Sequence, residues 1–237
     1  EAMTNWAEYW VETARKYFPD TEIYLVTGGD GNPILGADFS AQVKVVAKYN
    51  AGIRITNQND DYAHSFILTR LVASASRFYD SYFTTEEGLY NSPEGVTMRI
   101  FDAATSGAKG IYSKTIIRED TYHTFMGRNG HEIGELTESA VNLVQNIHHL
   151  TLEKPIIVVA VLFPNTSIAL NPAVMRSIYR QSSKLRDVLD FDLVDENMIV
   201  DGALEKYRFL ILLEESLLRR ETLMGIDKWI KNGAVSY

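Results

Sequence analysis

The feature that most constrains this chain is a fourfold alternation of helix-like and strand-like segments in its first half. Stretches with apolar residues three or four positions apart alternate with short runs rich in Val, Ile, Tyr and Phe, which are typical of helices and strands respectively. Such an alternation with short connections predicts an α/β fold, in which successive strands are parallel and joined by right-handed crossovers. The expected helices cover residues 2–18, 37–49, 62–77 and 96–107, and the expected strands cover 22–27, 52–56, 78–83 and 110–113.

The loops that follow these strands differ from the loops that precede them. The entering loops, such as Pro19–Asp20 and Asn50–Ala51, are short and plain. In parallel β/α barrels the loops after the strands build the active face. We therefore expect function at four loops rich in Gly, Asp, Asn or Glu, which cover residues 27–33, 56–61, 83–88 and 112–115.

Charge and composition argue against several classes of function. The formal net charge is −8 without a cluster of Lys and Arg, so we expect no binding to nucleic acid, which requires concentrated positive charge. The longest apolar run, 156–163, is far shorter than the roughly 20 residues of a membrane-spanning helix. Cys is absent, which excludes disulfides, thiolate metal sites and Cys nucleophiles. We expect no membrane association, no metal and no cofactor.

A second cycle of strands and helices begins at Pro155, after a polar, irregular stretch at 115–136 and an expected helix at 137–150. The pattern is typical of an open, flavodoxin-like sheet. It predicts two domains, residues 1–150 and residues 151–237. The chain begins within a helical pattern and ends at the start of a strand-like run, so we expect it to be truncated at both ends. The expected elements of the second cycle are strands at 156–163, 191–194 and 207–213 and helices at 172–189 and 219–232.

Two adjacent carboxylates, Glu86 and Glu87, follow the aromatic stretch 78–83. A carboxylate at this point could act as a nucleophile or base, beside aromatic faces on which a sugar ring can stack. The alternative is a solvated acidic turn without chemistry, which is the more common role of such a dipeptide. The position just past an expected barrel strand favours the functional interpretation.

Polar residues after the first two strands allow both binding and structural roles. The glycine-rich segment 28–33 does not match the dinucleotide-binding spacing, because Ile34 occupies the place of the third glycine. Asp30 and Asn32 are hydroxyl-binding candidates or turn formers. Gln58 belongs to a cluster, 57–61, that suits hydrogen bonding to hydroxyls, although Asp60 or Asp61 is expected to cap the next helix.

Two other motifs favour structural interpretations. His148 and His149 are adjacent on an expected helix and cannot share a face, so they do not predict a metal pair. The segment 163–167 (FPNTS) could cradle an anion at the helix that follows it, but a structural turn is the better interpretation.

Together these motifs resemble the second half of a clan-A glycoside hydrolase barrel, in particular the family 42 β-galactosidase-like group. The resemblance implies that residues 1–150 form the C-terminal half of a (β/α)8 TIM barrel. It also implies that residues 151–237 form part of a flavodoxin-like, amidotransferase-like trimerisation domain. It rests on YLVTGGDGNPILGADFSAQ (24–42), GIRITNQNDDY (52–62), ASRFYDSYFTTEEG (75–88), MRIFDAATSGAKGIY (98–112) and LFPNTSIAL (162–170).

The resemblance also implies roles for individual residues. In this clan the nucleophile is a Glu at the end of strand seven, which Glu86 matches, while Glu87 stands where relatives often have Pro and leaves an ambiguity of one residue. The acid/base Glu lies at the end of strand four, which falls at or before the first residue here, so Glu1 is its candidate. The implied sugar contacts are Asp30, Asn32, Gln58 and Tyr112.

The function implied is that of a retaining exo-glycosidase acting on a glycoside or oligosaccharide, within a homo-oligomer that is expected to be a trimer. The resemblance is compatible with the bacterial cytoplasm or periplasm and leaves the compartment open. One alternative is an inactive carbohydrate-binding or assembly subunit, which would lack the second carboxylate. Another is a nucleotide-binding protein or oxidoreductase, which the glycine spacing disfavours.

Overall fold

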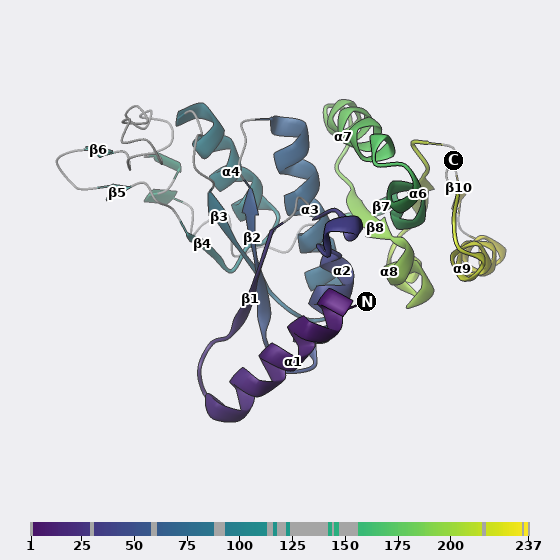
Figure 1. Cartoon of the computed structure of the whole chain (residues 1–237). Helices are drawn as coiled ribbons and strands as arrows, with labels where there is room; N and C mark the ends of the chain where they lie inside the picture. The colour runs from purple at the N-terminus through teal and green to yellow at the C-terminus, as the bar shows by residue number, and fades with distance from the viewer. Residues whose placement is uncertain are drawn as a thin grey trace.

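The first half of the chain forms a four-stranded parallel sheet (Figure 1). The computed structural model describes residues 2–28, 31–57, 61–87, 93–112, 116–117, 122–123, 142–143, 145–146, 156–214, 217–233 and 235–236. Neighbouring strands of this sheet follow one another in sequence order and are parallel, which confirms the predicted arrangement. They are β1 (Tyr24–Thr27), β2 (Gly52–Asn57), β3 (Phe83–Glu87) and β4 (Gly110–Tyr112).

Helices alternate with these strands and bury one face of the sheet. On this face Ile53, Ile55 and Phe83 are buried in the core. Because successive side chains of a strand point to opposite faces, Arg54 and Glu86 point away from the helices. The helices are α1 (Ala2–Tyr17), α2 (Phe39–Ala47), α3 (Tyr62–Phe78) and α4 (Pro93–Thr105).

The third strand begins five residues later than we predicted. The aromatic stretch at 78–83 has high strand propensity, but α3 extends to Phe78, and Asp80 turns the chain with a φ of 56°. The rings of Phe78 and Tyr79 pack edge to face at the end of the helix, with centroids 4.7 Å apart. Packing at a helix terminus therefore outweighs propensity here, and Glu86 lies within β3 rather than in the loop after it.

Aspartate caps start the helices that follow β1 and β2. The Asp38 carboxylate accepts a hydrogen bond from the backbone N–H of Ala41 at the start of α2. Asp61 accepts from the N–H groups of Ala63 and His64 at the start of α3, which confirms the expected cap.

The region between the two sheets is described only in part. Two short antiparallel strands, β5 (Ile116–Ile117) and β6 (Tyr122–His123), pair within the stretch that we predicted to be irregular. Most of the expected helix at 137–150 lies outside the described residues, and so do His148 and His149.

The second cycle forms another four-stranded parallel sheet, with the order β10-β9-β7-β8. Its strands are β7 (Val159–Phe163), β8 (Asp192–Asp195), β9 (Phe209–Ile211) and β10 (Val235–Ser236). The helices predicted at 172–189 and 219–232 correspond to α7 (Ala173–Arg186) and α9 (Arg220–Lys231). Short helices that we did not predict follow the first two of these strands, namely α6 (Asn165–Leu170) after β7 and α8 (Glu196–Val200) after β8, and the 3-10 helix η3 (Ala203–Lys206) follows α8.

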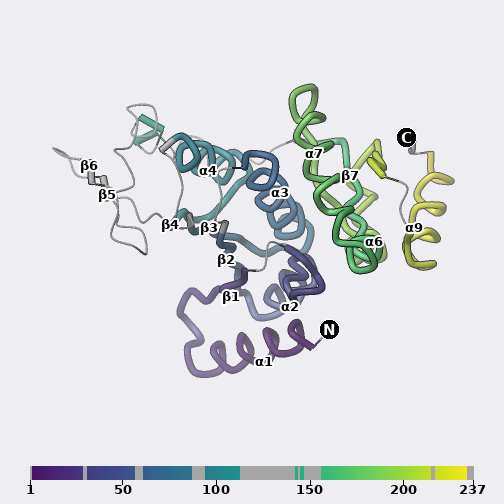
Figure 2. Tube along the Cα trace, turned by 45° about the horizontal axis from the view of Figure 1, so that its top comes forward, coloured from purple at the N-terminus to yellow at the C-terminus, as the bar shows by residue number. Residues whose placement is uncertain are grey.

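Helix α3 joins the two sheets (Figure 2). Every residue from His64 to Ser76 is buried, because α2, α4, α7 and β8 all pack against α3. Phe66 contacts Phe191 edge to face at 5.5 Å between ring centroids. Arg77 forms an ion pair with Asp192 of β8. A single apolar core therefore extends across both halves of the chain.

Candidate functional site

The candidate site is a group of charged, hydroxyl and aromatic side chains on the face of the first sheet that points away from the helices. Arg54 of β2 and Glu86 of β3 form an ion pair, with Nη2 and Oε2 2.9 Å apart. The Thr56 hydroxyl lies 3.3 Å from the same carboxylate oxygen. Both charged side chains are largely shielded from solvent, with 19% and 12% of their surface exposed. The strands thus hold Glu86 in one orientation near the C-terminal edge of the sheet.

Two tyrosine rings flank this ion pair. The Arg54 guanidinium carbon lies 5.9 Å from the ring centroid of Tyr24 and 5.6 Å from that of Tyr112. Tyr112 is in register with Glu86. Both rings are about half exposed, so they offer apolar surface beside a carboxylate. This combination suits a sugar, whose rings stack on aromatic faces while its hydroxyls bond polar groups.

Among the described residues of this face, two buried polar atoms have no hydrogen-bond partner. They are Nε of Arg54 and the hydroxyl of Thr84. Buried polar groups are normally paired, so such atoms are candidate bonding partners for a ligand.

The structure brings together only some of the residues that the sequence pointed to. Glu86 and Tyr112 lie side by side on β3 and β4. Glu87 is the last residue of β3, in register with Asn57, and only its place in the strand is described. Glu1, Asp30 and Gln58 lie outside the described residues.

Asn32 has a structural role. Its side-chain oxygen accepts a hydrogen bond from the backbone N–H of Ile34 at 3.0 Å, and so caps the 3-10 helix η2 (Pro33–Leu35). Its contact with a sugar remains a prediction.

Sequence reasoning missed Tyr24, Arg54 and Thr56. The signal was present, because Arg54 and Thr56 alternate with Ile53 and Ile55 in an otherwise apolar strand. Such alternation predicts a polar face with period two. Cross-strand register then brings this face of β2 beside Glu86.

The second sheet has a different C-terminal edge, which the chain's own carboxylates fill. Glu196, which follows β8, is fully buried. It accepts hydrogen bonds from the backbone N–H groups of Thr166 and Arg219, at 2.6 and 2.9 Å, and from the Thr222 hydroxyl at 3.2 Å. Thr166 belongs to the segment that we considered as an anion cradle. An internal carboxylate occupies this place, so the preferred interpretation of a structural turn is consistent with the contacts.

Asp195, at the end of β8, forms a buried polar link to the first half of the chain. Its carboxylate accepts hydrogen bonds from Ser40 of α2 and from Asn165, the latter at 2.8 Å. Burial, together with the nearby charge of Asp38, raises the pKa of Asp195 to about 6. Asn197 donates to Asp38 at 3.3 Å and completes the network.

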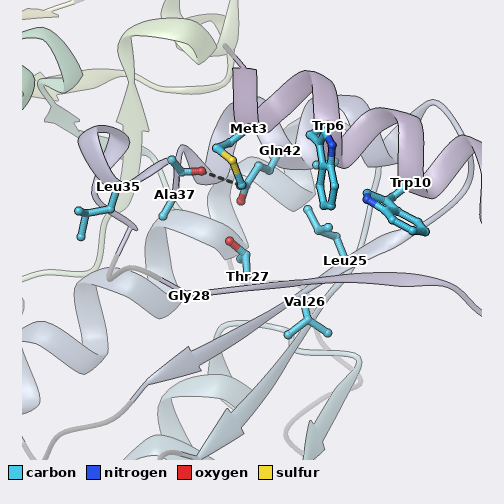
Figure 3. Close-up of a pocket in the computed structure, with 12 residues that line it drawn as sticks. Met3, Trp6, Trp10, Leu25, Val26, Thr27, Gly28, Leu35, Ala37 and Gln42 are labelled. Atoms are coloured by element: carbon cyan, nitrogen blue, oxygen red, sulfur yellow. Dashed lines mark hydrogen bonds between the residues drawn. The ribbon is translucent and has the colours of Figure 1, made fainter.

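An apolar hollow of about 400 Å³ lies between α1 and the open edge of β1 (Figure 3). Trp6 and Trp10 of α1 face Leu25 of β1 across it, whereas Val26 points to the opposite side of the strand. Both Trp side chains are at least half exposed. The hollow offers apolar surface but no acid, base or nucleophile.

Metal and membrane sites do not emerge from the described residues. No group of three or more His, Asp or Glu side chains among them is placed to bind a metal ion. No helix in the described part of the chain combines the length and apolar character needed to cross a membrane.

Comparison with known proteins places the fold. No model of a known protein family matches the sequence, and no curated protein matches it significantly. Among solved structures, the chain is similar to the apo exo-carrageenase GH42 from Bacteroides ovatus, with a TM-score of 0.69 and 14% sequence identity. The match covers 98% of this chain but only 36% of that chain. The resemblance to a family 42 glycoside hydrolase is thus confirmed for the fold.

Proposed function

We propose that this chain is part of a retaining glycoside hydrolase with Glu86 as its nucleophile. The observation that carries the proposal is the Arg54–Glu86 ion pair, held near the C-terminal edge of a parallel sheet between two half-exposed tyrosine rings. The active sites of β/α barrels lie at this edge. The fold shared with a family 42 exo-carrageenase supports the same assignment.

In this proposal residues 1–150 are the C-terminal half of a (β/α)8 barrel. Two features support a barrel that is completed by four further β/α units. First, β1 is an edge strand, and the Trp6–Trp10 hollow beside it is an exposed apolar surface of the kind that another element normally covers. Second, the solved structure that shares the fold is much longer than the region matched.

The proposed reaction is a double displacement with retention. The Glu86 carboxylate attacks the anomeric carbon, and the bond from that carbon to the leaving-group oxygen breaks. A second carboxyl group, about 5 Å away, donates its proton to that oxygen and then deprotonates the water that hydrolyses the covalent intermediate. Glu1 is the proposed second carboxyl, and Glu87 is the alternative nucleophile.

The remaining residues of the proposed site orient Glu86 or bind the sugar. Arg54 and Thr56 fix the rotamer of Glu86, and Tyr24 and Tyr112 offer stacking surfaces. Asp30, Asn32 and Gln58 are further proposed sugar contacts. We propose a β-galactoside-type substrate, as the family 42 resemblance implies.

Residues 151–237 are proposed to be a flavodoxin-like domain that serves assembly into a homotrimer. The parallel sheet with its first strand between the second and third supports a flavodoxin-like order. The edge that binds ligands in such folds is filled by Asp195 and Glu196. Leu223, Met224 and Ile230 of α9 are exposed apolar side chains, which support an interface between subunits. Sedimentation equilibrium tests the trimer.

The decisive experiment is labelling of the full-length protein with an activated 2-fluoro glycoside, followed by peptide mass spectrometry. A covalent adduct on Glu86 supports the assignment, and an adduct on Glu87 moves the nucleophile by one residue. If no adduct forms and the Glu86→Gln variant hydrolyses glycosides at the wild-type rate, this chain does not supply the nucleophile. Sugar binding without any turnover would favour the inactive binding subunit.

A further inference from the structure

The solvent face of α7 carries a row of three cations. Arg176, Arg180 and Lys184 are exposed and four residues apart, so their backbone positions are separated by about 6 Å along the helix axis. The row lines a groove of about 370 Å³ that also includes Asp61 and Tyr179. The sequence shows no basic cluster, because only helical periodicity aligns these three residues.

The three cations of this row have no ion-pair partner among the described residues, although Asp61 lines the same groove. Within the described ranges, none of the three cations lies within ion-pair distance of a carboxylate, whereas Arg186 on the same helix pairs with Asp190. Like charges four residues apart on a helix repel each other. In a chain with a net charge of −8, this local excess of positive charge attracts an anionic partner.

One end of the groove lies near the C-terminal edge of the first sheet. Asp61, in its wall, caps α3 and lies four positions after Asn57 at the end of β2. Four positions of chain span at most about 14 Å. Figure 1 shows α7 beside α3, so the cationic row lies next to the helix that begins at this edge.

We propose that this row binds a sulfated polysaccharide, which extends from the site at Glu86. This inference rests on the proposed function for the identity of the partner as a glycan. Evenly spaced cations along a line match the repeated charges of a linear polyanion, whereas a single small anion requires cations that converge on one point. Sulfate esters remain charged at all physiological pH values, so they supply such repeats.

The test compares the binding of the full-length protein to a sulfated galactan and to the same polymer after desulfation, by isothermal titration calorimetry. The variant Arg176→Ala/Arg180→Ala/Lys184→Ala is expected to raise the Kd for the sulfated polymer at least tenfold and to reduce its salt dependence. The matched control, Arg208→Ala/Arg220→Ala/Lys228→Ala, removes the same charge from exposed positions outside the groove and is expected to change the Kd less than threefold.

Three results would overturn the proposal. They are wild-type affinity in the groove variant, equal losses in both variants, and binding of the desulfated polymer or of a DNA oligonucleotide as tight as that of the sulfated one. Hydrolysis of a small neutral aryl glycoside separates this inference from the proposed function. That activity is expected to be equal in both variants, and its absence from the wild type would count against Glu86 rather than against the groove.

Discussion

Both parallel sheets of this chain carry carboxylates at their C-terminal edges, but the surroundings of these carboxylates differ between the two sheets. In the first sheet, Glu86 and Arg54 lie on an open face between exposed rings. In the second sheet, Asp195 and Glu196 are fully buried and bonded by the chain's own donors. The same architectural position is equipped for a ligand in one half and filled by protein in the other.

The C-terminal edge of a parallel sheet can therefore bind a ligand only where the protein's own side chains leave its hydrogen-bond donors free. Helix N-termini and strand ends there supply free N–H groups in either sheet. A side chain such as Glu196 that reaches back to these groups removes the binding capacity and stabilises the fold instead. The comparison predicts that carboxylates of the first edge affect activity and that carboxylates of the second affect stability.

The largest expected effect is that of Glu86→Gln on hydrolysis. The amide has nearly the same shape but is a far weaker nucleophile, so kcat should fall by at least about a thousandfold. The midpoint of thermal unfolding should change little. Steady-state kinetics and a thermal melt of the full-length protein measure the two. Glu87→Gln is the control and should cost much less, whereas equal and small losses in both variants would indicate that neither carboxylate takes part in the chemistry.

Glu196→Ala should affect stability instead. Removing this fully buried carboxylate takes the acceptor from the partly buried N–H groups of Thr166 and Arg219 and from the buried Thr222 hydroxyl, which should lower the free energy of unfolding by roughly 3 kcal/mol. Urea denaturation measures this change.

Added sulfate sharpens the test, because an anion can occupy the vacated place. Sulfate should raise the melting temperature of Glu196→Ala more than that of the wild type. The exposed Glu205→Ala is the control. A variant as stable as this control would contradict the view that Glu196 fills an anion site.

The buried Asp195 predicts a pH dependence of stability. Its pKa is raised to about 6 in the folded protein, from an ordinary value of 3.8, by burial and by the charge of Asp38. The folded state therefore binds this proton more tightly than the unfolded state. The contribution of Asp195 to the free energy of unfolding should therefore increase as the pH falls from about 7 to about 4, by an amount on the order of 2 kcal/mol.

Asp195→Asn should flatten that dependence. The slope will not vanish, because burial also raises the pKa of Asp102, to about 7, and this acts in the same direction. Urea titrations at several pH values compare the two proteins. Identical slopes would show that Asp195 does not bind the proton.

The smallest expected effect is that of Thr56→Val. The Thr56 hydroxyl is 3.3 Å from Glu86, a long hydrogen bond beside the shorter contact with Arg54. Its loss should lower kcat/KM by about threefold, which corresponds to roughly 0.6 kcal/mol. A loss as large as that of Glu86→Gln would mean that Thr56, rather than Arg54, sets the orientation of the carboxylate.

The parallel order of the first four strands could be predicted from the sequence alone, and so could the position of Glu86 near the end of the third strand. Alternating apolar periods and capping residues such as Asp61 are local signals, and local backbone preferences are enough to read them. The error in the third strand arose where aromatic residues serve a helix end as well as a strand.

The contacts between polar side chains, in contrast, depend on the tertiary structure. Arg54 and Glu86 become neighbours through the register of β2 on β3, and Ser40 reaches Asp195 across 155 residues of sequence. Register and helix docking depend on the summed burial of many apolar side chains, including those of α3 between the two sheets. A local sequence pattern does not contain this total burial. The open edge of the first sheet and the filled edge of the second can therefore be distinguished only in the folded structure.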